Sequence, residues 1–159
     1  MGIVQRRDRH AYYEGDALLP ELPHVGWTRP RSAGTYGLSA HRHIGWEICW
    51  LRRGTVDWWA GKHIHPVPAG SLYITQPGEE HGGVHSMLAP CDLFWLELRP
   101  LRGGLPGLLP GDGKALLTGL SHLRHRVFPG EPGLAALWQR LLTEHRDRHP
   151  LANVNVRAT

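Results

Sequence analysis

Residues 41–47 read His41-Arg42-His43-Ile44-Gly45-Trp46-Glu47, and a further histidine, His81, follows Pro77-Gly78-Glu79-Glu80. Along an extended strand, side chains alternate between two faces, so positions 41, 43 and 47 point to one side. On a helix, His43 and Glu47 would share a face while His41 would point away. Imidazoles and a carboxylate that converge on one side form a ligand set for a first-row divalent ion. We therefore predict a metal site made of His41, His43, Glu47 and His81, carried by strands rather than by a helix.

The other histidines do not repeat this pattern. His63 and His65 also form a His-x-His pair, but no carboxylate follows four residues later, and Pro66 comes directly after the pair. We interpret them as surface or rim residues. The alternative for the 41–47 set is a polar pocket floor that holds a ligand or water by hydrogen bonds.

The composition limits the class of protein. A chain of 159 residues, with 20 glycines and 13 prolines, is long enough for one domain built from many short strands. Two cysteines, Cys49 and Cys91, are too few to staple a secreted scaffold, which favours a cytoplasmic protein. The formal net charge of +4 is modest, and isolated basic pairs do not make a nucleic-acid groove. No apolar run reaches the length of a membrane span, so we expect no membrane partner.

The chain divides into four segments. Residues 1–25 are predicted to form an N-terminal arm, and residues 26–100 a run of strands separated by glycine and proline turns. Residues 101–131 are rich in glycine and proline and predict a loop-rich connection, with room for one strand that completes the sheet. In residues 132–159 leucines recur at helical spacing until Pro150. Because the last residues have neither a terminator nor a packing partner in the sequence, we expect the chain to be cut off inside a further element.

The two histidine motifs resemble those of the cupin superfamily, whose first motif supplies His-x-His and Glu and whose second supplies a last His. Glu47 follows His43 after three residues, and Gly54 follows Glu47 after six, as that pattern asks. The spacing of the second motif is kept by Gly70, Gly78 and His81. The resemblance implies an all-β fold, a single cupin barrel (a double-stranded β-helix or jelly roll) followed by one or two C-terminal helices. It also implies a bound divalent metal such as Zn, Ni, Fe or Mn.

Two positions depart from the cupin pattern. Gly37 sits closer to His41 than the family places its glycine, and His85 stands where the family often has Asn. Three interpretations of His85 remain open: a group that orients a metal ligand, a substitute ligand, or neither.

Within the cupins, the chain is most similar to the effector-sensing domains of AraC-type transcription regulators. The similarity covers roughly residues 25–155 and rests on the basic arm, the single barrel, the strand at 94–98 and the helix at 137–142. In that family the barrel binds a small molecule, often a sugar, and the helical part forms a homodimer. A helix-turn-helix pair further downstream contacts DNA. The resemblance therefore implies a sensing and dimerisation domain, with residues 132–159 preceding a DNA-binding domain that this chain does not contain.

The interior of a small barrel holds one small ligand. If the strand after His43 keeps its parity, Glu47, Cys49 and Leu51 face the cavity. Trp46, Ile48 and Trp50 then face the other side. Aromatic rings are common stacking surfaces for sugars, although most tryptophans are core residues. We predict ligand contacts from Cys49, Trp58, Tyr73, Gln76 and Trp95.

Two alternatives to a sensing domain remain at this point. A metal with three imidazoles, one carboxylate and open positions suits a cupin enzyme such as a dioxygenase or a sugar isomerase. The other alternative is a structural dimerisation module with an empty barrel.

Overall fold

The computed structural model describes residues 3–35 and 38–159, so Gly37 lies outside the described residues. A short 3-10 helix, η1, spans Val84–Ser86. The helices are α1 (Pro110–Ser121), α2 (Leu134–Asp147) and α3 (Ala152–Arg157). The strands are β1 (Val4–Arg6), β2 (Arg9–Tyr12), β3 (His24–Thr28), β4 (Trp46–Arg53), β5 (Thr55–Ala60), β6 (His63–Pro68), β7 (Ser71–Thr75), β8 (His81–Gly83), β9 (Asp92–Leu98) and β10 (Val127–Pro129).

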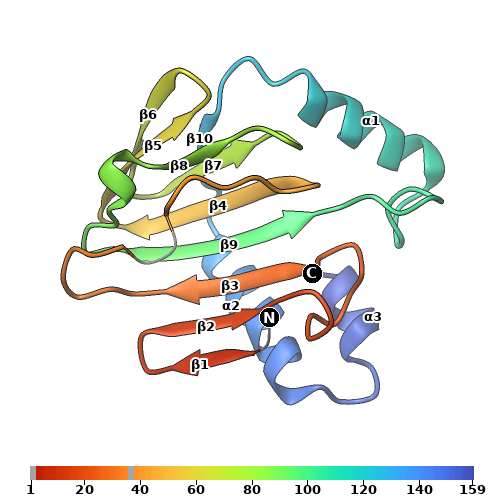
Figure 1. The fold of residues 1–159 in the computed structure, drawn as a ribbon. Helices are drawn as coiled ribbons and strands as arrows, with labels where there is room; N and C mark the ends of the chain where they lie inside the picture. The colour runs from red at the N-terminus through yellow and green to blue at the C-terminus, as the bar shows by residue number, and fades with distance from the viewer. Residues whose placement is uncertain (1–2, 36–37) are drawn as a thin grey trace.

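The strands form two antiparallel sheets (Figure 1). The larger sheet has the order β1-β2-β3-β9-β4-β7-β10, and the smaller has the order β6-β5-β8. Strands that follow one another in the chain are often not neighbours in the sheet, since β9 lies between β3 and β4, and β10 lies beside β7. The predicted fold class, all-β with C-terminal helices, is confirmed by this topology.

The core between the sheets is built from alternating side chains of both layers. Cys49 and Leu51 from β4 and Tyr73 from β7 meet Val56 and Trp58 from β5. The parity predicted from His43 is therefore correct, since these β4 side chains share the inner face with Glu47. The β4 residues that alternate with them pack on the outer face of the sheet, against the helices: Trp46, Ile48 and Trp50.

The tight turn between β4 and β5 depends on a glycine. Gly54 has φ +88°, a left-handed conformation that favours glycine. A Cβ at this position would also lie 2.6 Å from the carbonyl oxygen of Pro90. Gly54 thus ends β4 and directs the chain into the second sheet.

The N-terminal segment, predicted as an arm, is part of the larger sheet. The β1–β2 hairpin pairs with β3, with Arg9 opposite Thr28 and Tyr12 opposite Val25. Tyr12 is 1% exposed, and Leu19, in the turn region that follows β2, is 2% exposed. The hairpin is therefore anchored both by its backbone and by buried side chains.

The prediction of a loop over the first part of 101–131 was wrong. Helix α1 begins at Pro110, where a proline costs no helical hydrogen bond, and it continues through three glycines. Its Leu120 packs with Trp46 and Ile74 on the outer face of the larger sheet. Burial of this apolar contact outweighs the poor helix propensity of the segment. The strand that the prediction allowed in this region is β10, which pairs with β7.

The C-terminal helices also lie on the outer face of the larger sheet (Figure 1). The leucine stripe of α2 is used within the chain, since Leu134, Trp138 and Leu141 pack with Trp50 and other residues of the sheet.

The expectation that the last residues lack a packing partner was wrong. Ala152 and Val156 of α3 are buried, and Arg157 binds Glu21 through a contact of 2.6 Å. Among the described residues, no helix combines the length and the apolar character that a membrane span requires.

Candidate functional site

The four predicted metal ligands come together between the two sheets. His41 and His81 form an isolated antiparallel bridge, whose backbone hydrogen bonds of 3.0 and 3.1 Å join the segment before β4 to β8. Glu47 is the second residue of β4. The segment that carries the motif is not one continuous strand, as predicted, because the backbone bends at residues 44–45 and β4 begins only at Trp46.

Gly45 allows this bend. A Cβ at Gly45 would lie 2.2 Å from the carbonyl oxygen of Leu98, because the backbone passes close to the end of β9. The Gly45 N–H donates to Oε1 of Glu97 at 2.7 Å. The glycine thus brings the segment that carries His43 against the strand that carries Glu97.

Glu47 lies at the centre of the cluster. The ligand atoms of its four residues are all within 4.8 Å of one another. Glu47 Oε1 is 3.4 Å from Nε2 of His43, and Glu47 Oε2 is 3.1 Å from Nε2 of His81. The ring centroids of His41 and His81 are 4.4 Å apart. The structure therefore brings the whole predicted ligand set together.

The three imidazoles are oriented through their Nδ1 atoms. His41 and His81 each place Nδ1 close to the carbonyl oxygen two residues earlier, at 2.6 and 2.8 Å. His43 Nδ1 faces Oε2 of Glu97 at 3.6 Å. A proton on Nδ1 that is donated to these acceptors leaves the Nε2 lone pair free, which is the tautomer that a metal ligand needs.

The Nε2 atoms of His43 and His81 are buried and have no hydrogen-bond partner. Although His81 Nε2 lies close to Glu47, this contact lacks the geometry of a hydrogen bond. A buried polar atom without a partner costs about 1–3 kcal/mol. A divalent ion held by three Nε2 lone pairs and one carboxylate would satisfy these atoms together. The residues therefore fit a first-row divalent metal, and Zn, Ni, Fe and Mn all accept this donor set.

The electrostatics of the cluster favour its metal-binding form in part. Burial raises the pKa of Glu47, but the imidazoles of His43 and His81 outweigh burial and hold this pKa well below its usual range. Burial lowers the pKa of His41, which favours the neutral ring. Burial also lowers the pKa of His81, but contact with Glu47 outweighs it and raises this pKa above its ordinary value. A metal would therefore displace a proton from His81 as it binds.

Glu97 forms an outer layer behind His43. Its carboxylate is 1% exposed and accepts hydrogen bonds from the Gly45 N–H and, at 3.2 Å, from Arg99 Nε. His24 Nδ1 lies 3.1 Å from Oε2 of Glu97. Burial raises the pKa of Glu97, but His24, Gly45 and Arg99 together lower this pKa to about 2. Glu97 therefore stays ionised and can accept the Nδ1 proton of His43.

A cavity of about 410 Å³ adjoins the cluster. Three of the residues predicted to bind ligand, Cys49, Trp58 and Trp95, line it together with His41, His43 and Glu47. Two others do not, so their predicted placement was wrong. Tyr73 lies behind the wall, stacked on the Trp58 ring with centroids 5.2 Å apart. Gln76 donates to the carbonyl of Ser121 on α1 and does not line the cavity.

The sequence analysis missed three residues of the cavity wall: Arg9, Tyr13 and His24. Arg9 and Tyr13 come from the segment predicted as an arm, and no local motif marks them. Their position follows only from the pairing of β2 with β3, and of β3 with β9.

The remaining histidine interpretations are simpler. His63 and His65 belong to neither group of described residues that could hold a metal, which agrees with their interpretation as surface or rim residues. His85 is exposed on η1 and is absent from both groups, so it is neither a substitute ligand nor a support for one among the described residues.

Residues 29–152 match the family model of the AraC-like ligand binding domain. The chain belongs to this family. The family prediction is thus confirmed, and it places a ligand-binding domain around the cavity described above. No curated protein sequence matches the chain significantly.

Several solved structures resemble the chain at low identity. A predicted oxalate decarboxylase from Thermotoga maritima is 17% identical, with a TM-score of 0.42 over 57% of this chain and 80% of that one. A bacterial pirin from Escherichia coli in complex with nickel(II) is 17% identical, with a TM-score of 0.42 over 62% and 48% of the two chains. A cupin-2 domain protein from Shewanella frigidimarina is 16% identical, with a TM-score of 0.35 over 62% and 78%.

Proposed function

We propose that this chain is the effector-sensing and dimerisation domain of an AraC-type transcription regulator, with a divalent metal held by His41, His43, Glu47 and His81. The observation that carries the proposal is a cavity of about 410 Å³ beside this cluster, in a member of a ligand-binding family. A cavity of this size suits a small molecule. The metal would supply a positive charge that a polar group of the ligand can bind.

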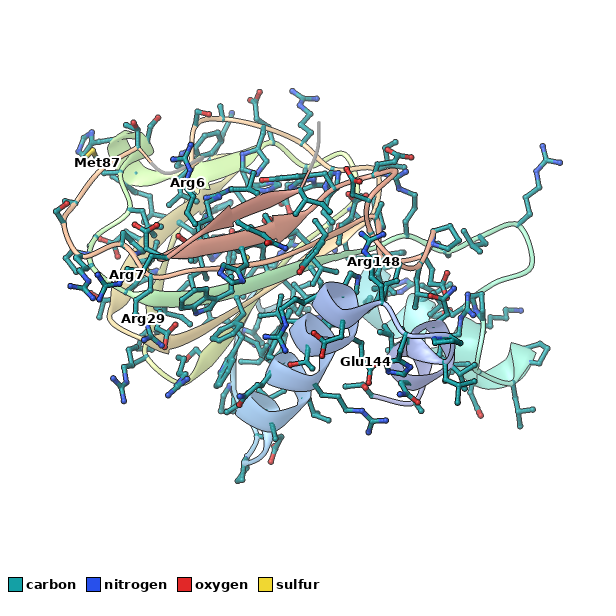
Figure 2. The ribbon with its side chains drawn as sticks, turned by 90° about the horizontal axis from the view of Figure 1, so that it is seen from below. Arg6, Arg7, Arg29, Met87, Glu144 and Arg148 are labelled. Carbon is teal, nitrogen blue, oxygen red and sulfur yellow. The ribbon has the colours of Figure 1, made fainter. Side chains whose placement is uncertain are left out.

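Strand β2 links the cavity to helix α2. Arg9, at its start, and Tyr13, directly after its end, line the cavity. The Tyr12 ring points instead toward α2, where its centroid lies 5.2 Å from that of His145. Arg148, at the end of α2, donates a hydrogen bond to the carbonyl of Asp16 in the turn after β2 (Figure 2). A ligand that prefers one position of β2 would therefore bias α2 as well.

The helical layer is the part that we propose to form a homodimer. One face of α2 already packs on the sheet, so the dimer would use apolar surface that remains exposed. Leu137 on α2 is 44% exposed, and Val154 on α3 is 61% exposed. DNA would be bound through a downstream domain. The free thiols of Cys49 and Cys91 suit the cytoplasm, where such a regulator acts.

A ligand screen followed by tryptophan fluorescence tests the sensing function. Trp58 and Trp95 lie in the cavity wall, so a bound effector should change the emission of the protein in a saturable way. Trp95→Phe should reduce the amplitude of this change, whereas Trp138→Phe, under α2, should leave most of it. If no member of a broad panel of small molecules changes the emission, the sensing function is contradicted.

A metal-dependent enzyme, such as a dioxygenase or a sugar isomerase, is the second candidate. It is favoured by the same set of three imidazoles and one carboxylate beside a cavity, since such a metal polarises a carbonyl or activates water. Turnover of a candidate substrate by metal-loaded protein, lost in His43→Ala, would support the enzyme. Binding without turnover supports the sensing domain.

A further inference from the structure

The cavity wall separates its polar groups from its apolar ones. The metal cluster forms one part of the wall, and Arg9 with Tyr13 forms another. Between them, the wall consists of apolar and aromatic side chains: Leu38, Cys49, Trp58, Leu88, Leu93 and Trp95. Among the described lining residues, Glu47 is the one acidic side chain, and it is already engaged with His43 and His81.

We infer that the effector is an organic anion, in which a carboxylate that pairs with Arg9 is attached to a flat apolar body that lies against Trp95 and Trp58. This inference rests on the proposed sensing function and names the chemical class of its ligand.

The guanidinium of Arg9 is held ready for such a ligand. Its carbon atom Cζ lies 5.0 Å from the centroid of the Trp95 ring, and Nη2 donates to the hydroxyl of Tyr13 at 3.1 Å. These contacts fix the plane of the guanidinium at the wall of the cavity. A fixed guanidinium loses little conformational entropy when it pairs with a carboxylate through two parallel hydrogen bonds.

The position of Trp95 is fixed from the other side by a glycine. A Cβ on Gly26 would lie 2.2 Å from Cζ2 of Trp95, so the indole can lie against β3 only because residue 26 has no side chain. The layered arrangement of Gly26, Trp95 and Arg9 thus builds a flat apolar surface with a cation at its edge. An aromatic or planar body with an anionic end matches this surface.

The charge balance around the cavity also favours an anion. Arg9 and Arg42 are both lining residues, and Arg42 is only loosely paired with Glu80, at 3.4 Å in exposed positions. The nearby carboxylate of Glu97 is already paired with Arg99. A divalent metal in the cluster would add further positive charge.

The same wall is a poor match for a sugar, the effector that the family resemblance suggests. Every hydroxyl that a sugar buries needs a partner, at a cost of about 1–3 kcal/mol for each one left unpaired. The described lining residues include no Asn, Gln or Asp side chain. The hydroxyl of Thr28 donates to the carbonyl of Asp8, and that of Tyr13 accepts from Arg9, so both already have partners.

Titration of the purified protein with 3-phenylpropionate and its neutral amide, 3-phenylpropanamide, tests the inference, with arabinose as a sugar probe. We expect the carboxylate to bind at least about tenfold more tightly than the amide, since a hydrogen bond to a charged group contributes about 1.5–3 kcal/mol. Arg9→Gln should weaken carboxylate binding by a similar factor and leave the amide unchanged. Arg6→Gln is the matched control, because Arg6 is exposed near the turn of the same hairpin and does not line the cavity (Figure 2).

The outcomes separate the inference from the function on which it rests. Equal binding of carboxylate and amide, or tighter binding of arabinose, would overturn the anion preference and leave sensing intact. A carboxylate preference that survives in Arg9→Gln but disappears after chelation of the metal would overturn the role of Arg9. If no probe binds, charged or neutral, both the inference and its place in the sensing function are contradicted.

Discussion

Glu47 on β4 and Glu97 on β9 stand directly opposite each other in the larger sheet. Like charges at facing positions destabilise a sheet. His43 lies between them, with Nε2 3.4 Å from Glu47 and Nδ1 3.6 Å from Glu97. One imidazole therefore connects two carboxylates with different tasks. Glu47 faces the cavity among the candidate ligands, whereas Glu97 lies behind His43 and is neutralised by Arg99.

The first prediction concerns the metal itself. The purified protein should bind about one divalent ion per chain, and His43→Ala should lower the affinity at least about a hundredfold, because losing a ligand costs more than losing a supporting partner. Isothermal titration with Zn²⁺ measures both quantities. His63→Ala is the control, since His63 belongs to another His-x-His pair that is not part of the cluster. Equal affinities in both variants would contradict the site.

The second prediction concerns Glu97 as the partner of His43. In Glu97→Gln an amide N–H can take the place of Oε2, and it would oppose a proton on Nδ1 of His43. That substitution favours the tautomer with the proton on Nε2, which cannot bind a metal. We expect the metal affinity to fall about 10–100-fold. Glu80→Gln, an exposed position, should leave it unchanged.

The third prediction is a pH dependence of stability in the metal-free protein. The pKa of Glu97 is about 2 in the folded chain, below its ordinary value of 4.5. The stabilisation from this depressed pKa is fully present above about pH 4.5 and is lost as the pH falls toward 2, with an upper limit of about 3 kcal/mol. Urea unfolding of the wild type and of Glu97→Gln should show a difference that shrinks across this window. A difference that does not change with pH would contradict the assignment.

The candidate ligands could be predicted from the sequence because their spacing is local. Three of them lie within seven residues, and the strand parity that places Glu47 and Cys49 on the inner face is a property of β4 alone. The prediction survived the bend at residues 44–45 because the Gly45 backbone packs against β9 and returns the chain to the same face. Local spacing was sufficient even though the segment is not one strand.

The outer wall of the site could not be predicted in this way. Arg9 and His24 reach the cavity only because β2 pairs with β3 and β3 with β9, and pairing between distant strands leaves no periodic signal in one sequence. Helix α1 was missed for another reason. Its glycines oppose a helix locally, and the packing of Leu120 on the sheet overrides them.

The fourth prediction tests the contact between the helical layer and the sheet. Trp138 is 5% exposed and packs with Phe94 and Trp50. Trp138→Ala should lower the free energy of unfolding by about 3–5 kcal/mol, because it leaves a large cavity in this cluster. The neighbouring Leu137, which is 44% exposed, provides the control, and Leu137→Ala should cost less than about 1 kcal/mol in dilute protein. Similar losses in the two variants would mean that α2 does not pack on the sheet through Trp138.

The fifth prediction uses two glycines with opposite surroundings. Gly26→Ala places a Cβ against the Trp95 indole, so it should destabilise the protein by about 1–3 kcal/mol and alter tryptophan emission. Gly119→Ala lies in α1 with open space around the added Cβ, and it should stabilise the protein by about 0.5–1 kcal/mol, since alanine is the better helix former. Chemical denaturation of both variants measures the two signs. If Gly26→Ala is as stable as the wild type with unchanged emission, Trp95 does not lie against β3, and the flat surface inferred for the effector loses its support.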